Sequence, residues 1–109
     1  MQKKPLPGIH PTAVIADSAK IHSSVSIGAY CVIGENVIIA ERTVLMPNVI
    51  IADDVQIGTD CFIYSAVSIY HEVIIKNRVI LHSGCVIGAD GFGLAHDVDH
   101  FVKIPQLGS

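Results

Sequence analysis

A chain of 109 residues is long enough for one domain with a single hydrophobic core. Half of the residues are hydrophobic, but Gly, Asn, Asp or Glu interrupts each apolar run well before the roughly 20 residues that a membrane-spanning helix needs. The net charge of -3 and the seven scattered Lys and Arg residues argue against nucleic acid or an anionic membrane as a partner. The chain begins "MQKKPLPGIHP", in which no apolar stretch follows the lysines, so we expect no secretory signal and a cytoplasmic location.

A branched aliphatic side chain recurs at every sixth position over most of the chain. It is found at Ile9, Ile15, Ile21, Ile27, Ile33, Ile39, Leu45, Ile51, Ile57, Ile63, Ile69, Ile75, Leu81 and Ile87. A small or β-branched residue lies two positions before each of these from Ile15 onward, and all three cysteines occupy this slot. We therefore interpret Cys31, Cys61 and Cys85 as small buried side chains, and their odd number argues against a disulfide framework.

The six-residue period determines the predicted fold class. An α-helix cannot keep such a period on one face, whereas a short strand followed by a corner can. Polar pairs that favour turns, such as Glu35 with Asn36 and Pro47 with Asn48, fall at the expected corners. Three hexads form a triangular coil of about 18 residues, and coils stacked about 4.8 Å apart pair their strands in parallel. The prediction is an all-β parallel β-helix of four to five coils over residues 9–88, in a single domain 1–109.

The three-hexad coil sorts the outward side chains into three faces. One face carries the apolar set that we expect to pack against a neighbouring chain, because a contiguous exposed apolar surface of this extent usually marks an interface. This set is Val44, Met46, Phe62, Tyr64 and Ile80, followed by His82. A second face carries Val14, Val32, Ile50 and Val86 beside small residues, and the third is more polar, with Lys20, His22, Gln56 and Lys76.

The regular pattern ends after Ile87. The segment 89–103, which contains most of the "GADGFG" motif, is predicted to leave the coil as a loop, and 104–109 to return to it. Phe92 lies in this loop, and an aromatic side chain on a loop usually has something to pack against. His96 and His100 are four residues apart, a spacing that suits a metal on a helix, but little else there favours a helix. We therefore expect no metal site and no cofactor.

Four motifs carry a resemblance to a known family. The hexads resemble the hexapeptide-repeat acyltransferases, whose fold is a left-handed parallel β-helix. The segments "GIHPTAVIA", "VSIYH", "GCVIGADGFG" and "KIPQLG", in this order, closely resemble the UDP-3-O-acylglucosamine N-acyltransferases of lipid A biosynthesis. The handedness of the predicted β-helix comes from this resemblance alone. What the chain contains resembles the central portion of such an enzyme.

The resemblance implies a function for the chain. Members of the family transfer a 3-hydroxyacyl group from acyl carrier protein to the amine of UDP-3-O-acylglucosamine, and they assemble as homotrimers. The histidine that serves as their general base follows "KIPQLG" by several dozen residues, so we expect no catalytic residue in this chain and no activity of the chain alone. Candidate substrate-binding residues are Asp90, Phe92, His96, His71 and His82. Two alternatives remain open, namely a non-catalytic trimeric β-helix module and a zinc-dependent hydratase-like β-helix.

Overall fold

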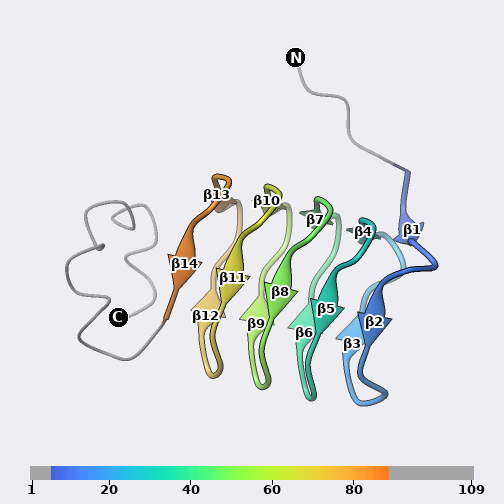
Figure 1. The fold of residues 1–109 in the computed structure, drawn as a ribbon, viewed down its shortest axis with the longest axis horizontal. Helices are drawn as coiled ribbons and strands as arrows, with labels where there is room; N and C mark the ends of the chain where they lie inside the picture. The colour runs from blue at the N-terminus through green and yellow to red at the C-terminus, as the bar shows by residue number, and fades with distance from the viewer. Residues whose placement is uncertain (1–5, 89–109) are drawn as a thin grey trace.

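The computed structural model describes residues 6–88, and this part of the chain contains fourteen two-residue strands and no helix. Figure 1 shows them stacked in coils along the axis of the molecule. Their bounds are β1 Gly8–Ile9, β2 Val14–Ile15, β3 Lys20–Ile21, β4 Ser26–Ile27, β5 Val32–Ile33, β6 Ile38–Ile39, β7 Val44–Leu45, β8 Ile50–Ile51, β9 Gln56–Ile57, β10 Phe62–Ile63, β11 Ser68–Ile69, β12 Ile74–Ile75, β13 Ile80–Leu81 and β14 Val86–Ile87. With three strands to a coil, they form four full coils and part of a fifth, which agrees with the prediction.

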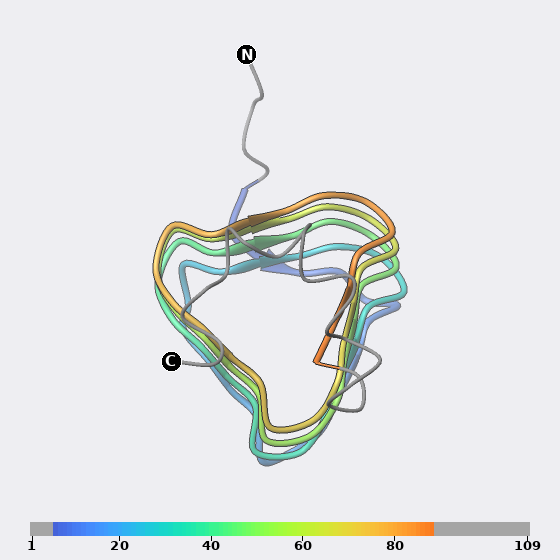
Figure 2. The ribbon, with the colours of Figure 1, turned by 90° about the vertical axis from the view of Figure 1, so that its left-hand side faces the viewer.

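The strands form the three parallel sheets of a triangular prism (Figure 2). The first sheet contains β1, β4, β7, β10 and β13, the second β2, β5, β8, β11 and β14, and the third β3, β6, β9 and β12. Each strand pairs with its counterpart in the next coil, as Val44 does with Phe62 and Phe62 with Ile80. In Figure 2 the last coil is nearest the viewer, and the chain runs clockwise through β12, β13 and β14 as it comes forward. The coil is therefore left-handed, as the family resemblance implied.

The core is the inside of the prism, where the aliphatic column and the small-residue column point. From Val25 onward nearly every residue of these two columns is buried, with Cys85 only partly so. The first coil is different, because it packs against another coil on one side only. Ile9 is 50% exposed, and Ile15 and Ile21 are only partly buried.

The small-residue slot also forms hydrogen bonds that explain why cysteine and threonine occur in it. The Cys31 thiol donates to the carbonyl oxygen of Met46 at 3.2 Å, and the Cys61 thiol donates to that of Lys76 at 3.1 Å. The Thr43 hydroxyl donates to the carbonyl oxygen of Gly58 at 2.7 Å. In each case the acceptor belongs to the corner of the next coil. A small side chain with one donor therefore satisfies a carbonyl oxygen inside each of these corners.

We expect the buried thiols to be much less reactive than the thiol of Cys85. Burial raises the pKa of Cys31 and of Cys61, which keeps both thiols protonated and poorly nucleophilic. A thiol reagent at about pH 8 should therefore modify the half-buried Cys85 first and the other two only as the chain unfolds. Equal modification rates at Cys31 and Cys85 in the folded protein would contradict this.

The same pKa shifts predict a loss of stability in alkali. Because folding raises the pKa of both thiols above the ordinary value of 9.0, the unfolded chain loses its thiol protons first as the pH rises. The stabilising contribution is therefore complete below that value and declines above it. Urea unfolding at increasing pH measures the decline, and a Cys31→Val variant should show less of it.

The corners depend on a backbone conformation that L-residues seldom adopt. Nine non-glycine residues have φ between +57° and +66°, one at every sixth position: Tyr30, Asn36, Arg42, Asn48, Asp54, Asp60, Ala66, Glu72 and Arg78. This conformation turns their N–H groups toward the preceding coil, where the amide of Asp54, for example, donates to the carbonyl oxygen of Glu35 at 2.9 Å. Asn and Asp tolerate this left-handed region best among non-glycine residues.

Ala66 adopts this conformation with a φ of +65° and has no polar side chain that could compensate. We expect Ala66→Gly to raise the free energy of unfolding by about 1 kcal/mol, because glycine relieves the backbone strain. The matched control is Ala52→Gly, at a half-buried position outside the positive-φ set, where added chain entropy should lower stability. Urea melts of the two variants should move in opposite directions, and a shift of both toward lower stability would refute the explanation.

Candidate functional site

The outward face of the first sheet carries a continuous aromatic column. Phe62 and Tyr64 flank the inward Ile63, so both point outward, and their ring centroids lie 4.8 Å apart. Tyr64 and His82 follow paired strands of adjacent coils, and their rings stack at 5.6 Å with an interplanar angle of 29°. The column thus combines two rings of one coil with the imidazole of the next coil.

Val44 does not belong to the exposed part of this face, contrary to the prediction. It is only 2% exposed within the single chain, and its neighbour Ser26 in the same column is 4% exposed. Val44 lies in register between Ser26 and Phe62, so a short branched side chain stands beside a much larger ring. The apolar surface available on the first sheet is therefore centred on Ile80, which is 50% exposed, with Phe62, Tyr64 and Met46 half-buried.

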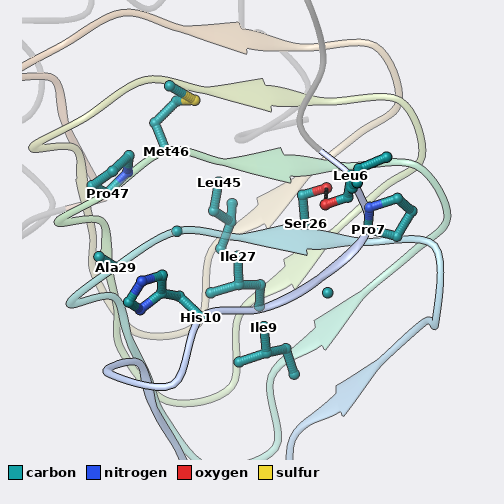
Figure 3. A pocket seen from close by; sticks show the side chains of 12 residues that line it. Leu6, Pro7, Ile9, His10, Ser26, Ile27, Ala29, Leu45, Met46 and Pro47 are labelled. Atoms are coloured by element: carbon teal, nitrogen blue, oxygen red, sulfur yellow. Dashed lines mark hydrogen bonds between the residues drawn. The ribbon is translucent and has the colours of Figure 1, made fainter.

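A hollow of about 490 Å³ opens at the beginning of the same face (Figure 3). The small residues Gly8, Ser26 and Gly28 make room for it in the first two coils. Leu6 and Pro7 lie on one side of the hollow in Figure 3, and Met46, Pro47 and His10 lie on the other. The Ser26 hydroxyl donates to the carbonyl oxygen of Leu6 at 3.0 Å and so holds the N-terminal segment against the sheet. The lining is apolar apart from Ser26 and His10, which suits an apolar group better than a charged one.

The second sheet presents the longer exposed apolar column. Val14 is 62% exposed and Ile50 is 49% exposed, and Val32 and Val86 continue the column in other coils. The third face is the most polar, with a shallow hollow between Lys20, His22 and Glu41. The prediction selected the first face as the interface, and the structure shows that exposed apolar side chains also line the second face.

The structure separates the two histidines that were predicted to contact substrate. His71 is exposed in the corner that follows β11 of the second sheet, and His82 is exposed directly after β13 of the first sheet. The two residues therefore occupy different corners of the prism. Asp90, Phe92 and His96, together with the predicted loop 89–103, lie outside the described residues.

Neither a cluster of metal ligands nor a membrane-spanning helix occurs among residues 6–88. In this range no three or more His, Cys, Asp or Glu side chains come together in a way that could hold a metal ion. The same part of the chain contains no helix of the length and apolarity needed to cross a membrane.

The hollow beside His10 was missed by sequence reasoning. A usable signal was present, because glycine or serine occupies three outward positions of the first two coils. Where an outward side chain is that small, the neighbouring coils leave space on the surface of the sheet.

The hexad repeats match a known protein family. The family described as bacterial transferase hexapeptide (six repeats) matches residues 31–67 and 54–89. The two matches together extend from the second coil to the end of the regular coils and include more than half of the 109 residues.

Curated relatives match a shorter part of the chain than the family does, with 62–75% sequence identity over that part. UDP-3-O-acylglucosamine N-acyltransferases from Xanthomonas oryzae pv. oryzae and Chromohalobacter salexigens are 68% and 75% identical over 28 residues. The enzyme of the same name from Porphyromonas gingivalis is 62% identical over 29 residues. Each match spans 26–27% of this chain and only 8% of the relative.

A solved structure extends the likeness to most of the chain. The crystal structure of UDP-N-acetylglucosamine acyltransferase superposes with a TM-score of 0.70 at 26% sequence identity. The superposition covers 77% of this chain and 38% of the other.

Proposed function

The chain belongs to the bacterial transferase hexapeptide family, and from this premise we propose that it is the prism of an N-acyltransferase acting on UDP-3-O-acylglucosamine. The observation that carries the proposal is the identity of 62–75% to enzymes of that name over 28–29 residues. The similarity in fold to a UDP-N-acetylglucosamine acyltransferase supports the same class of sugar nucleotide. The proposed reaction is a step of lipid A biosynthesis.

In the proposed reaction, the amine nitrogen of UDP-3-O-acylglucosamine attacks the thioester carbonyl carbon of a 3-hydroxyacyl group on acyl carrier protein. A carbon–nitrogen bond forms, the carbon–sulfur bond breaks, and the carrier leaves as a thiol. The amine must also lose a proton, and a general base has to lie within about 3 Å of it to accept that proton. We place this base outside residues 1–109, so that the chain contributes binding and positioning rather than proton transfer.

The candidate positioning residues fall into two groups. His82 is stacked on Tyr64, which holds the imidazole against the outward face of the first sheet. We assign Asp90, Phe92 and His96, which follow the last coil in the sequence, to the substrate cleft together with His82. His71 lies at a different corner of the prism and is a separate candidate for substrate contact. The hollow beside Met46 and Pro47 offers an apolar surface on the same sheet.

The test is an assay of the 109-residue chain with 3-hydroxyacyl carrier protein and UDP-3-O-acylglucosamine. The Chromohalobacter salexigens enzyme serves as the positive control. We expect no turnover by the chain alone, together with measurable binding of the sugar nucleotide that is weakened in His82→Ala. Turnover that is abolished by His71→Ala or His82→Ala would show that the chain carries its own base. Absence of both turnover and binding would favour a non-catalytic module.

We also propose that the chain forms a homotrimer through the exposed part of the first face, comprising Met46, Phe62, Tyr64 and Ile80. Phe62→Glu should then convert a trimer into a monomer in sedimentation experiments, because a carboxylate would be buried without a partner. Ile74→Glu introduces a carboxylate on the third face instead and should leave the assembly intact. If Ile50→Glu disrupts the trimer and Phe62→Glu does not, the contact lies on the second face instead.

A further inference from the structure

The corners of the first coil are constructed differently from those above them. In this coil the side-chain oxygens of Thr12, Ser18 and Ser24 accept the backbone N–H groups of the next coil. The donors are Tyr30, Asn36 and Arg42, respectively, at 2.9, 2.8 and 2.9 Å. Higher corners mostly use a main-chain carbonyl oxygen for the same purpose. Three hydroxyl groups thus connect the first coil to the second at its corners.

Two of these hydroxyl groups depend on a histidine. The Thr12 hydroxyl lies 2.8 Å from His10 Nδ1, and the Ser24 hydroxyl lies 2.8 Å from His22 Nδ1. The same Nδ1 atoms accept the backbone N–H groups of Thr12 at 3.2 Å and of Ser24 at 3.0 Å. A backbone N–H can only donate, so each Nδ1 must be an unprotonated acceptor. The arrangement therefore requires neutral imidazoles that carry their proton on Nε2.

At the third corner Ala16 stands where the other two corners have histidine, and the acceptor for the hydroxyl proton is a carboxylate of the second coil. The Ser18 hydroxyl donates to Glu35 Oε1 at 2.5 Å while it accepts the N–H of Asn36. A carboxylate remains an acceptor throughout the range in which histidine titrates. The first coil therefore contains two corners closed by a histidine and one closed by a carboxylate.

The corner hydrogen bonds contribute a larger share of the stability of the first coil than of any described coil above it. Its inward residues Ile9, Ile15 and Ile21 are exposed or only partly buried, whereas their counterparts from Ile27 onward are buried. With less apolar burial to hold it, the first coil relies more on its hydrogen bonds to the second coil.

We propose that His10 and His22 form a pH-sensitive latch that holds the first coil on the prism at neutral pH and releases it in mild acid. Protonation places an N–H on Nδ1, directly opposite the N–H groups of Thr12 and Ser24. Both backbone donors then lose their acceptor, and the hydroxyl groups lose the acceptor for their own protons. The first coil loosens while the coils above it remain folded.

The charged surroundings of the two histidines differ. The hollow beside His10 is lined by apolar residues and Ser26, with no charged side chain among them. His22 shares its hollow with Lys20 and Glu41. The nearby Arg42 side chain is paired with Asp60 at 2.8 Å. His22 therefore faces one charge of each sign, and the two corners have to be followed separately.

The experiment is an NMR titration of the full chain between about pH 7.5 and pH 5, the range in which histidine changes charge. Imidazole ¹⁵N shifts should show the Nε2–H tautomer for His10 and His22 at the upper pH. The exchange protection of the Thr12 and Ser24 amides, corrected for intrinsic rates, should fall by about fivefold or more as the pH is lowered. The protection of the Asn36 amide should fall less than that of Tyr30 and Arg42.

Variants separate the latch from a general effect of acid. In the double variant His10→Asn with His22→Asn, each side-chain amide oxygen can accept as Nδ1 does but does not titrate, so the pH dependence should disappear. His71→Asn alters an exposed corner histidine outside the first coil, and this variant should retain the pH dependence of exchange protection. Nδ1–H tautomers at the upper pH, or a pH dependence that persists in the double variant, would overturn the proposal. The experiment uses no substrate, so its outcome is independent of the proposed acyl transfer.

Discussion

Replacing Ile57 by alanine is expected to lower the free energy of unfolding by about 2 to 5 kcal/mol. Ile57 is 2% exposed and lies in the third sheet between Ile39 and Ile75, which are also buried. Truncation removes apolar burial and leaves a cavity that the coils on either side cannot fill, because their positions are determined by backbone pairing. Urea unfolding monitored by circular dichroism measures the loss.

The neighbouring Ile74 provides the matched control for this prediction. It belongs to the same sheet but points outward and is 47% exposed, so Ile74→Ala should cost less than about 1 kcal/mol. The two substitutions delete the same atoms, and only the direction of the side chain differs. Equal losses would mean that the inside and the outside of the prism have been assigned incorrectly.

Gly34→Ala is expected to cost about 1 to 3 kcal/mol, because at this corner the next coil passes too close for a side chain. A Cβ atom at Gly34 would lie 2.8 Å from the carbonyl carbon of Ala52 and 2.9 Å from the nitrogen of Asp53. It would also collide with Asp53 Oδ1, which accepts the N–H of Glu35 at 2.8 Å. Because two of these neighbours are backbone atoms, the coil itself has to move.

A second glycine distinguishes close packing from backbone strain. Gly84 has a φ of +82°, and a Cβ atom added there would meet nothing within 4 Å, so Gly84→Ala introduces strain without a collision. We expect Gly34→Ala to be the more destabilising of the two in urea melts, and Gly34→Val to be worse still. A Gly34→Ala variant no less stable than Gly84→Ala would show that the coils can separate at little cost.

Periodicity made the fold predictable from the sequence. A side chain that recurs at every sixth position takes the equivalent place on each of the three sides of a coil, so all such side chains point in the same direction relative to the axis. The inward positions of Ile33, Ile51 and Leu81 followed directly. The prediction for Val44 was wrong because alternation determines only the direction of a side chain. Its exposure also depends on the size of Phe62, its neighbour in the next coil.

The candidate site was less predictable, since it depends on contacts between coils. The stacking of Tyr64 on His82 and the hollow beside His10 both depend on residues of adjacent coils. Neither is evident from a single hexad. The link between His22 and the amide of Arg42 passes through the hydroxyl of Ser24, and no composition or spacing rule signals such a chain of hydrogen bonds. Asp90, Phe92 and His96 remain predictions.

The pairing of each strand with its counterpart in the next coil determines how such a prism can change in length. Inserting or deleting three hexads lengthens or shortens the prism by one coil, about 4.8 Å, and leaves every later residue on its original face. Inserting a single hexad instead rotates everything that follows by a third of a turn. Ile80 and His82 would then leave the face of Phe62 and Tyr64 for an adjacent one. Among related chains, length differences between the aromatic column and the last coil should therefore occur in whole coils, and insertions of one hexad should be confined to the ends of the prism.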